Sequence, residues 1–250
     1  MLVEDRQDRI VRLVHESGSM TVPDLARALE TSESTIRRDL VALDAQHRLA
    51  KVHGGATALE RAHVMRDLTI PERADLHTEE KRSIARYAAG FIEDESFVYI
   101  DSGSTTLQLI EVLPRLHGVV YVTDSVGHAR RLAARGHRTV VLGGELKPET
   151  EALVGPDALA TLDRYRFACG FWGANGVSAA CGLTTPDIEE AQVKRVSMEH
   201  AERLYVLCDA SKFDMVAPVK FADFDQATIL TDSAAPEAYR TYRNVTVVSA

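Results

Sequence analysis

The stretch FVYIDSGSTT, residues 97–106, decides the fold of most of this 250-residue chain. Its first four residues are apolar and predict a short buried strand. A polar turn follows at 101–106, and a helical pattern is predicted over Thr105–Leu113. A strand, a tight polar turn and a helix in this order are typical of one unit of an α/β sheet.

The same alternation recurs on both sides of this stretch. Six further apolar runs predict strands at Val119–Val122, Thr139–Leu142, Phe167–Phe171, Leu204–Cys208, Ala227–Leu230 and Val245–Val248. The amphipathic patterns between them predict helices around Ile84–Phe91, Ser125–Ala134, Pro156–Leu162 and Pro186–His200. Buried strands between such helices indicate a Rossmann-like parallel sheet that is covered on both faces.

Ligands of a parallel α/β sheet collect at the carboxyl ends of its strands. The segments that follow five predicted strands are small and polar, and we expect them to converge on one crevice: 101–106, 123–125, 143–145, 173–176 and 209–212. The turn at 101–106 combines free backbone N–H groups, hydroxyls and a helix N-terminus, which suit a phosphate. The alternative is that its Ser and Thr residues only cap the helix. No P-loop and no proper Gly-x-Gly-x-x-Gly motif occurs, so nucleotide binding is not favoured.

Three charged residues extend this predicted site. Lys212 follows a predicted strand end, where an ammonium group can hold an anionic substrate. Asp101 can accept hydrogen bonds from sugar hydroxyls. Lys194 lies four residues after Glu190, so its alternative role is a helix-surface ion pair that contributes only ~0.2–0.5 kcal/mol.

The first 57 residues differ from the rest, because their helical periodicity comes in short blocks. Three apolar sets predict three helices: Ile10, Leu13 and Val14; Val22, Leu25, Ala26 and Leu29; Ile36, Leu40 and Leu43. Ser32 is a candidate N-cap for the third helix, and the alternation over 49–56 predicts a β-hairpin, or wing. We therefore predict a winged helix-turn-helix over 1–57, a linker over 58–70 and an α/β effector-binding domain over 71–250.

The third predicted helix presents polar side chains away from its apolar face. Arginine can bond guanine through two hydrogen bonds in the major groove, and Ser or Thr can hold phosphates or base edges. The wing can reach the flanking backbone or the minor groove. The DNA-binding residues expected from this pattern are Ser32, Ser34, Thr35, Arg37, Arg38, Lys51 and His53. The alternative is a plain three-helix bundle whose arginines are solvated.

The net charge of −8 argues against a protein that coats nucleic acid without selectivity. Residues 1–60 hold eight basic and ten acidic residues, but 34–57 hold four basic and two acidic ones. The basic surplus is thus confined to the third helix and the wing. This distribution predicts DNA binding through base contacts and paired half-sites, with few phosphate contacts.

The remaining composition is that of an ordinary globular protein, 45% hydrophobic and 26% charged. The N-terminus lacks a signal-peptide pattern, and no run approaches the ~18 apolar residues of a membrane helix. Cys169, Cys181 and Cys208 lack the spacing of metal ligands, so we expect small core residues. These features predict a cytoplasmic protein with no membrane partner, no metal and no cofactor.

Ordered blocks along nearly the whole chain resemble the DeoR family of bacterial transcriptional regulators. In the N-terminal part they are Arg6-Gln7, Thr35-Ile-Arg-Arg-Asp-Leu40 and Val52-His-Gly-Gly-Ala56. In the rest they are Arg73, Glu80-Lys81, Ile84-Ala85, 103–105, Gly143-Gly144, 173–176, 182–185, Glu190-Ala191, Lys194, Asp209 and Ser211-Lys212. Three positions depart from the family: Glu30, where a small residue such as Gly is common, and His77 and Asp124, where Asn is common.

The resemblance implies a repressor of a carbohydrate-catabolic operon, which binds double-stranded operator DNA as a dimer or tetramer and responds to a phosphorylated sugar. The sensor domain of the family is similar in fold to ribose-5-phosphate isomerase. By position, the resemblance implies a phosphate loop at Ser102, Gly103, Ser104, Thr105 and Thr106, and further effector contacts at Asp101, Asn175, Lys194 and Lys212. Thr123, Gly143 and Gly144 join them because they follow predicted strands.

A sugar-phosphate isomerase with an accessory DNA-binding domain is the first alternative. Such an enzyme needs a carboxylate base near the reacting carbons. The isomerase pattern Gly-Ala-Asp-x-x-Asp reads Gly173-Ala-Asn-Gly-Val-Ser178 here, and a following Lys-Gly looks like Cys181-Gly182. An amide and a hydroxyl cannot take a proton at neutral pH, so the sequence predicts a binding pocket and no enzyme. The second alternative is an architectural DNA-binding protein without a ligand.

Overall fold

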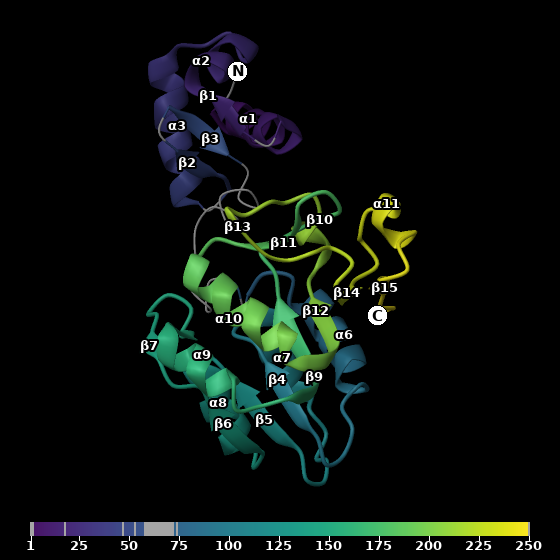
Figure 1. Ribbon diagram of the computed structural model, residues 1–250. Coiled ribbons are helices and arrows are strands. Elements are labelled where there is room, and N and C mark those ends of the chain that lie inside the picture. Colours follow the sequence, from purple (N-terminus) through teal and green to yellow (C-terminus); the bar gives the residue numbers. More distant parts are fainter. Residues whose placement is uncertain are drawn as a thin grey trace. The chain divides into compact units, whose positions relative to one another are not determined.

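The computed structural model describes residues 3–17, 19–46, 48–52, 54–57, 73 and 75–249 (Figure 1). The chain divides into two compact units, Met1–Arg66 and Asp67–Ala250, which are described separately. The predicted linker and His53 lie outside the described residues. Among the helices described, none is long and apolar enough to cross a membrane.

The N-terminal unit is a winged helix-turn-helix. Its elements are α1 Val3–Ser17, β1 Ser19–Thr21, α2 Val22–Ala28, α3 Glu33–Ala45, β2 Ala50–Val52 and β3 Gly55–Thr57. The three predicted helices and the β2–β3 hairpin are confirmed. Strand β1, which pairs antiparallel with β3, was not predicted because three residues give no readable alternation. The predicted apolar residues form the core of this unit, and Ile10, Leu25 and Ile36 are fully buried.

The turn between α2 and α3 contains Glu30, at a position where a small residue was expected from the resemblance described above. The N–H of Thr31 donates to Ala26 O at 3.0 Å and that of Glu30 to Arg27 O at 3.3 Å, which is a Schellman motif. Glu30 has φ 49°, a left-handed conformation that favours glycine. Ser32 then caps α3 as predicted, since its side chain accepts from Thr35 N.

The second unit is built on a seven-stranded parallel sheet in the order β15-β14-β12-β9-β4-β5-β6. All seven predicted strands are confirmed, with ends shifted by a few residues. Their bounds are β4 Phe97–Ile100, β5 Val120–Thr123, β6 Arg138–Val141, β9 Phe167–Gly173, β12 Ala201–Leu207, β14 Thr228–Thr231 and β15 Val245–Val247.

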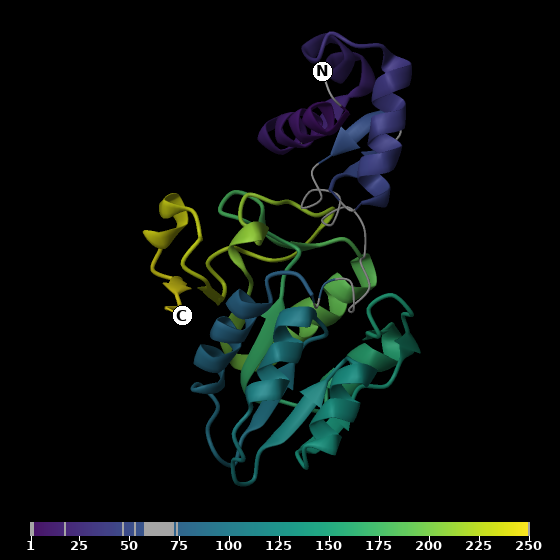
Figure 2. The same cartoon turned by 180° about the vertical axis from the view of Figure 1, so that it is seen from behind.

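Helices cover both faces of this sheet, as predicted. They are α6 Thr78–Ala89, α7 Ser104–Val112, α8 Val126–Ala134, α9 Pro156–Leu162, α10 Ile188–Glu199 and α11 Glu237–Arg240, with a 3₁₀ turn η1 at Ala210–Lys212. Side chains of successive strand residues pack into the cores on opposite faces of the sheet, because side chains alternate along a strand. Phe171 packs with residues of α6 and α7, whereas Trp172 packs with α9 and α10. Figure 1 shows α10 on one face, and Figure 2 shows α6 from the other side.

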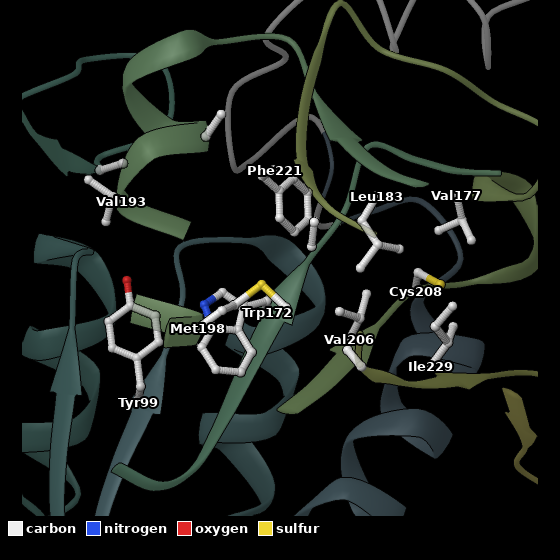
Figure 3. Close-up of a cluster of buried hydrophobic side chains, with 14 of the residues drawn as sticks. Tyr99, Trp172, Val177, Leu183, Val193, Met198, Val206, Cys208, Phe221 and Ile229 are labelled. Atoms are coloured by element: carbon white, nitrogen blue, oxygen red, sulfur yellow. The ribbon is translucent and has the colours of Figure 1, made fainter. Parts of the chain in front are cut away.

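The α10 side carries the larger core (Figure 3). Tyr99 and Trp172 stack at 5.5 Å between ring centroids, and Trp172 Nε1 donates to Ser197 Oγ at 2.9 Å. Met198 of α10 lies beside Trp172, so the helix is held by both packing and a buried hydrogen bond. These contacts fix the position of α10 and with it that of Lys194, which lies on the same helix.

Five short strands were not predicted. They are β7 Glu145–Leu146, β8 Leu153–Val154, β10 Gly176–Ser178, β11 Gly182–Thr185 and β13 Val219–Ala222, and they form two small antiparallel sheets. The expectation that all three cysteines are core residues was wrong for Cys181, which is exposed beside the β10–β11 turn. Cys169 and Cys208 are buried.

Candidate functional site

Helix α3 has one buried and one exposed face. Ile36, Leu40 and Leu43 are fully buried, while Arg37 and Arg38 are exposed on the side away from them. The two predicted DNA-reading arginines therefore lie on the free face. Ser34 is also exposed and Thr35 half-buried, and the hydroxyls of both lie within 3.0 Å of Ser32 Oγ.

The exposed arginines of α3 are held along their own helix. Arg37 Nη2 lies 2.7 Å from Glu33 Oε2, and both side chains are exposed. Arg38 Nε donates to Ser34 O at 3.4 Å. Both guanidinium groups remain at the surface, where a DNA phosphate or base edge can compete for them.

A buried carboxylate ties α3 to α1. Asp39 accepts from Arg6 Nε at 2.6 Å, from Arg6 Nη2 at 3.2 Å and from Gln7 Nε2 at 3.3 Å. The sequence blocks Arg6-Gln7 and Thr35–Leu40 thus contact each other, because Asp39 of the second block binds both residues of the first. Asp44 makes the corresponding link to the wing, because its carboxylate accepts from the backbone N–H of Lys51 at 2.9 Å. The Lys51 side chain is exposed.

The loop after β4 is buried throughout residues 101–106. Asp124, at the end of the neighbouring β5, accepts from Ser102 N at 2.7 Å and lies 3.1 Å from Ser102 Oγ. Thr123 Oγ1 accepts from Ser125 N at 3.1 Å and supports the start of α8. The ends of β4 and β5 therefore form one hydrogen-bonded site.

His128 is a site residue that sequence reasoning missed. Its Nε2 lies 3.2 Å from Thr106 Oγ1, and that hydroxyl also lies 2.7 Å from Asp101 O and 3.0 Å from Gly103 O. The Thr106 hydroxyl has one hydrogen and faces two carbonyl acceptors, so His128 must donate from Nε2. Burial lowers the pKa of His128 to about 4, and the ring is neutral at pH 7.

The central contact of the site joins residues 93 positions apart. Asp101 Oδ2 accepts from Lys194 Nζ and from Gly173 N, the latter at 2.9 Å. Lys194 Nζ also lies 3.3 Å from Gly173 O. The alternative of a helix-surface pair between Lys194 and Glu190 was therefore wrong. Glu190 instead accepts from Thr150 Oγ1 at 2.6 Å and lies 3.6 Å from Lys147 Nζ.

The charge of Lys194 acts on two buried carboxyl groups, those of Asp101 and Asp124. Burial raises the pKa of Asp101, and Lys194 offsets part of that rise. Burial, together with the charge of Asp101, raises the pKa of Asp124 to about 8. Asp124 is therefore protonated at neutral pH. Separately, Asp101 Oδ1 is a buried acceptor with no hydrogen-bond donor among the described residues.

A second cluster lies where β12 ends. Lys81 is buried on the inner face of α6 and donates to Arg73 O at 2.5 Å. Burial, opposed by the charge of Asp209 and aided by that of Lys212, lowers the pKa of Lys81 to about 8. Lys81 was missed as a site residue, although its spacing from Ile84, Ala85 and Ala88 could have indicated that it lies on the buried face of the helix.

Asp209 and Lys212 share the η1 turn. Asp209 Oδ1 accepts from Ser211 N at 3.1 Å and from Ser211 Oγ at 2.5 Å. Burial acts to raise the pKa of Asp209, but Lys212, Ser211, His77 and Lys81 together lower it, so the carboxylate is ionised. Its Oδ2 is buried and has no hydrogen-bond partner in the described part of the chain. Lys212 Nζ likewise makes no ion pair there.

Two predicted glycines lie apart from these clusters. Gly143 N donates to Thr161 Oγ1 at 3.3 Å, and both Gly143 and Gly144 are exposed beside α9. A Cβ at Gly144 would lie only 2.4 Å from Val154 O of β8, and the residue has φ 121°. The close approach of the β7–β8 hairpin and this backbone conformation therefore account for glycine at position 144. Hydrogen bonds join the residues at or just after the ends of β4, β5 and β9, the residues that follow β12 form the second cluster, and Gly143 after the edge strand β6 is bonded to α9.

Asn175 lies two residues beyond Gly173. Its Oδ1 accepts from Thr185 Oγ1 at 3.1 Å, which orients the amide with its NH₂ group free to donate. Within the described ranges, no group of three or more His, Cys, Asp or Glu side chains is arranged to hold a metal ion. The site is therefore a set of buried hydrogen-bonding and charged groups at the carboxyl edge of the sheet.

Two family models match this chain. A DeoR-like helix-turn-helix domain matches residues 6–62, and a DeoR C terminal sensor domain matches residues 76–233. The "Uncharacterized HTH-type transcriptional regulator FruR" of Bacillus subtilis (strain 168) is 36% identical over 99% of this chain and 98% of its own length. The "HTH-type transcriptional regulator GlpR" of Haloferax volcanii is 33% identical over 93% and 91%.

Another relative is the "Lactose phosphotransferase system repressor" of Staphylococcus epidermidis, 31% identical over 92% of each chain. Among solved structures, ribose 5 phosphate isomerase A from Neisseria gonorrhoeae is similar at 20% identity over 54% of this chain and 53% of that chain, with a TM-score of 0.41. The two family models together match most of the sequence, and the relatives match it almost from end to end. The chain belongs to the DeoR family of helix-turn-helix transcriptional regulators.

Proposed function

We propose that this chain represses a carbohydrate-catabolic operon and that a phosphorylated sugar controls its affinity for operator DNA. Relatives support the first part, since two of them are named as the lactose phosphotransferase system repressor and a putative aga operon transcriptional repressor. The exposed arginines of α3 support the DNA-binding role. The effector is proposed from the α/β unit alone.

The observation that carries the effector proposal is the start of α7. Gly103 is its N-cap and supplies no side-chain hydrogen bond. The N–H groups of Ser104, Thr105 and Thr106 have no acceptor among the described residues, although all three residues are buried. Buried helix N-termini normally find an acceptor, and a phosphate is a suitable one.

The orphaned carboxylate oxygens support a sugar as the remainder of the ligand. Asp101 Oδ1 and Asp209 Oδ2 are buried acceptors without donors in the described structure. Sugar hydroxyls are donors, and buried acceptors left unpaired are costly, ~1–3 kcal/mol each. Lys212 supplies a cation at the same edge for the phosphate.

Regulation requires that the ligand favours one arrangement of the protein over another. An effector shifts the population between DNA-competent and incompetent states only through a difference in affinity for the two. We propose a dimer or tetramer, because paired recognition helices read repeated or palindromic half-sites. We also propose that the protein acts in the cytoplasm, where sugar phosphates and the operator are found together.

We propose that the site binds and does not catalyse. Asn175 and Ser178 stand where an isomerase has carboxylates, and Ser178 Oγ accepts from Cys181 N in the β10–β11 turn. Glu190 already accepts a hydrogen bond from Thr150. It is therefore a poor candidate for the base that would move a proton between carbons 1 and 2 of a sugar phosphate. A coupled assay on ribose and fructose phosphates is expected to show no turnover, and turnover would establish the enzyme instead.

The decisive test is a gel-shift titration of operator DNA with a panel of sugar phosphates and the corresponding free sugars. We expect one phosphorylated compound to lower the fraction of bound DNA, and its unphosphorylated form to have no effect. A protein that binds DNA but responds to none of the panel would contradict the sensor role and leave the DNA-binding role intact.

A further inference from the structure

The exposed face of α3 contains one large apolar side chain, that of Val41, in its centre. Ser34, Arg38, Val41 and Ala45 follow one another at spacings of four, three and four, so they form a single stripe along the helix. This stripe lies opposite the fully buried Ile36 and Leu43. Val41 is 55% exposed, and it is absent from the core cluster of its unit.

Valine is a poor choice for an exposed helix position on grounds of stability. Its β-branched side chain loses χ1 freedom in a helix, and it gains nothing here from burial. The polar side chains of the stripe are engaged along the helix, Arg38 with Ser34 O and Ser34 with Ser32 Oγ. The two methyl groups of Val41 are left as an apolar surface between charged neighbours.

We propose that Val41 contacts the 5-methyl group of a thymine in the major groove and thereby selects bases in the operator. This inference rests on the proposed DNA-binding role of α3. The thymine methyl is the apolar feature of the major-groove edge, and apolar side chains recognise it. Residues 38 and 41 lie about 4.5 Å apart along the helix axis, against about 3.4 Å per base step, so Arg38 and Val41 reach neighbouring base pairs.

The test uses the full chain and a duplex selected from a random-sequence pool by affinity. Each thymine of that duplex is replaced in turn by deoxyuridine, which removes only the methyl group. We expect one position per half-site at which this change weakens binding about fourfold, the value of one buried methyl group. Val41→Ala should weaken binding to the thymine duplex by at least as much and should show no further loss on uracil at that position.

The control is Val3→Ala on α1. Val3 is also 55% exposed, so the two variants remove the same atoms from equally exposed sites. We expect Val3→Ala to retain both the affinity and the uracil effect. Alanine favours helix more than valine does, so Val41→Ala retains a folded α3, which circular dichroism verifies.

The outcomes separate this inference from the role on which it rests. If no duplex is enriched over the random pool, the DNA-binding role itself fails. If a duplex is enriched but uracil is tolerated at every thymine, Val41 does not read a methyl group. A uracil effect that persists unchanged in Val41→Ala assigns the methyl contact to another residue and overturns the proposal.

Discussion

Asp124 makes the candidate effector site sensitive to pH. It is buried, its carboxyl group contacts Ser102 at the start of the proposed phosphate loop, and the charged groups that act on it are Asp101, Glu190 and Lys194. Because burial raises the pKa of Asp124 to about 8, the group is neutral below pH 8 and ionises above it. An ionised carboxylate repels an anionic ligand.

We therefore predict that effector affinity falls as the pH rises through about 8. One linked proton corresponds to about a tenfold loss per pH unit well above the pKa. Asp124→Asn should reduce this loss between pH 7.5 and 9.5 and leave the part that comes from deprotonation of Lys81, whose pKa is also about 8, as measured by calorimetric titration with the effector found in the panel. An equal pH dependence in the two proteins would assign the titration to another group.

Lys212 offers a second test at the scale of one residue. Removing a charge-assisted contact to phosphate costs ~1.5–3 kcal/mol, so Lys212→Ala should weaken effector binding about 10- to 100-fold. Operator affinity without effector should not change. The matched control is Lys220→Ala, because Lys220 pairs with Asp223 in an exposed i,i+3 pair. A normal effector response in Lys212→Ala would contradict the proposed position of the phosphate.

Individual residues were predictable from sequence only in part. The strand-end rule identified Asp101, and the family resemblance implied Lys194, but their ion pair joins residues 93 positions apart, and no spacing reports such a contact. Asp39 was missed for the same reason, since its partners lie on another helix. His128 was missed because a buried polar group on a helix has the same pattern as an ordinary core position.

At the scale of elements, α3 is the helix that we propose reads the operator. Arg37→Ala should weaken operator binding about tenfold, since a good base contact contributes ~1–3 kcal/mol. Its only described partner is Glu33, in an exposed pair, so the fold should be unchanged. Arg82→Ala is the matched control, because Arg82 forms a similar exposed pair with Glu79 in α6. Fluorescence anisotropy with labelled operator measures both, and undiminished affinity in Arg37→Ala would refute the assignment of the reading face.

The α2–α3 turn provides a stability test. Glu30 adopts φ 49° at the C′ position of a Schellman motif, which costs a residue with a side chain ~1–2 kcal/mol. Glycine removes that cost but loses more entropy on folding, so Glu30→Gly should stabilise the N-terminal unit by ~0.5–1 kcal/mol. Urea unfolding followed by circular dichroism tests this. A destabilised variant would mean that the Glu30 side chain contributes contacts of its own.

The long elements were predictable and the short ones were not. The seven strands of the parallel sheet are nearly continuous apolar runs, because both faces are covered. Strands such as β7 and β10 have two or three residues, too few for a period of two to appear. Their pairing depends on loops that the main sheet holds in place, so these short strands can be recognised only once the tertiary structure is known.

At the scale of the whole molecule, the two units should respond differently to ligand. A ligand at 100 times its Kd stabilises the unit that binds it by ~2.7 kcal/mol. For a unit of this size we expect a rise of about 5–10 °C in the Tm of the α/β transition, with no direct effect on the N-terminal unit. Differential scanning calorimetry with and without effector measures this. A uniform shift of both transitions would show that the units unfold as one.

The ion pair between Asp101 and Lys194 has a consequence for synthesis on the ribosome. Strand β3 of the N-terminal unit ends at Thr57, and 136 residues must follow before Lys194 is added. At about 5–20 residues per second, this interval lasts roughly 7–27 s. During it a nascent chain has the whole helix-turn-helix sequence but lacks the ammonium group that pairs with Asp101. If the proposed effector site is correct, the N-terminal unit is complete on the ribosome several seconds before the effector site is.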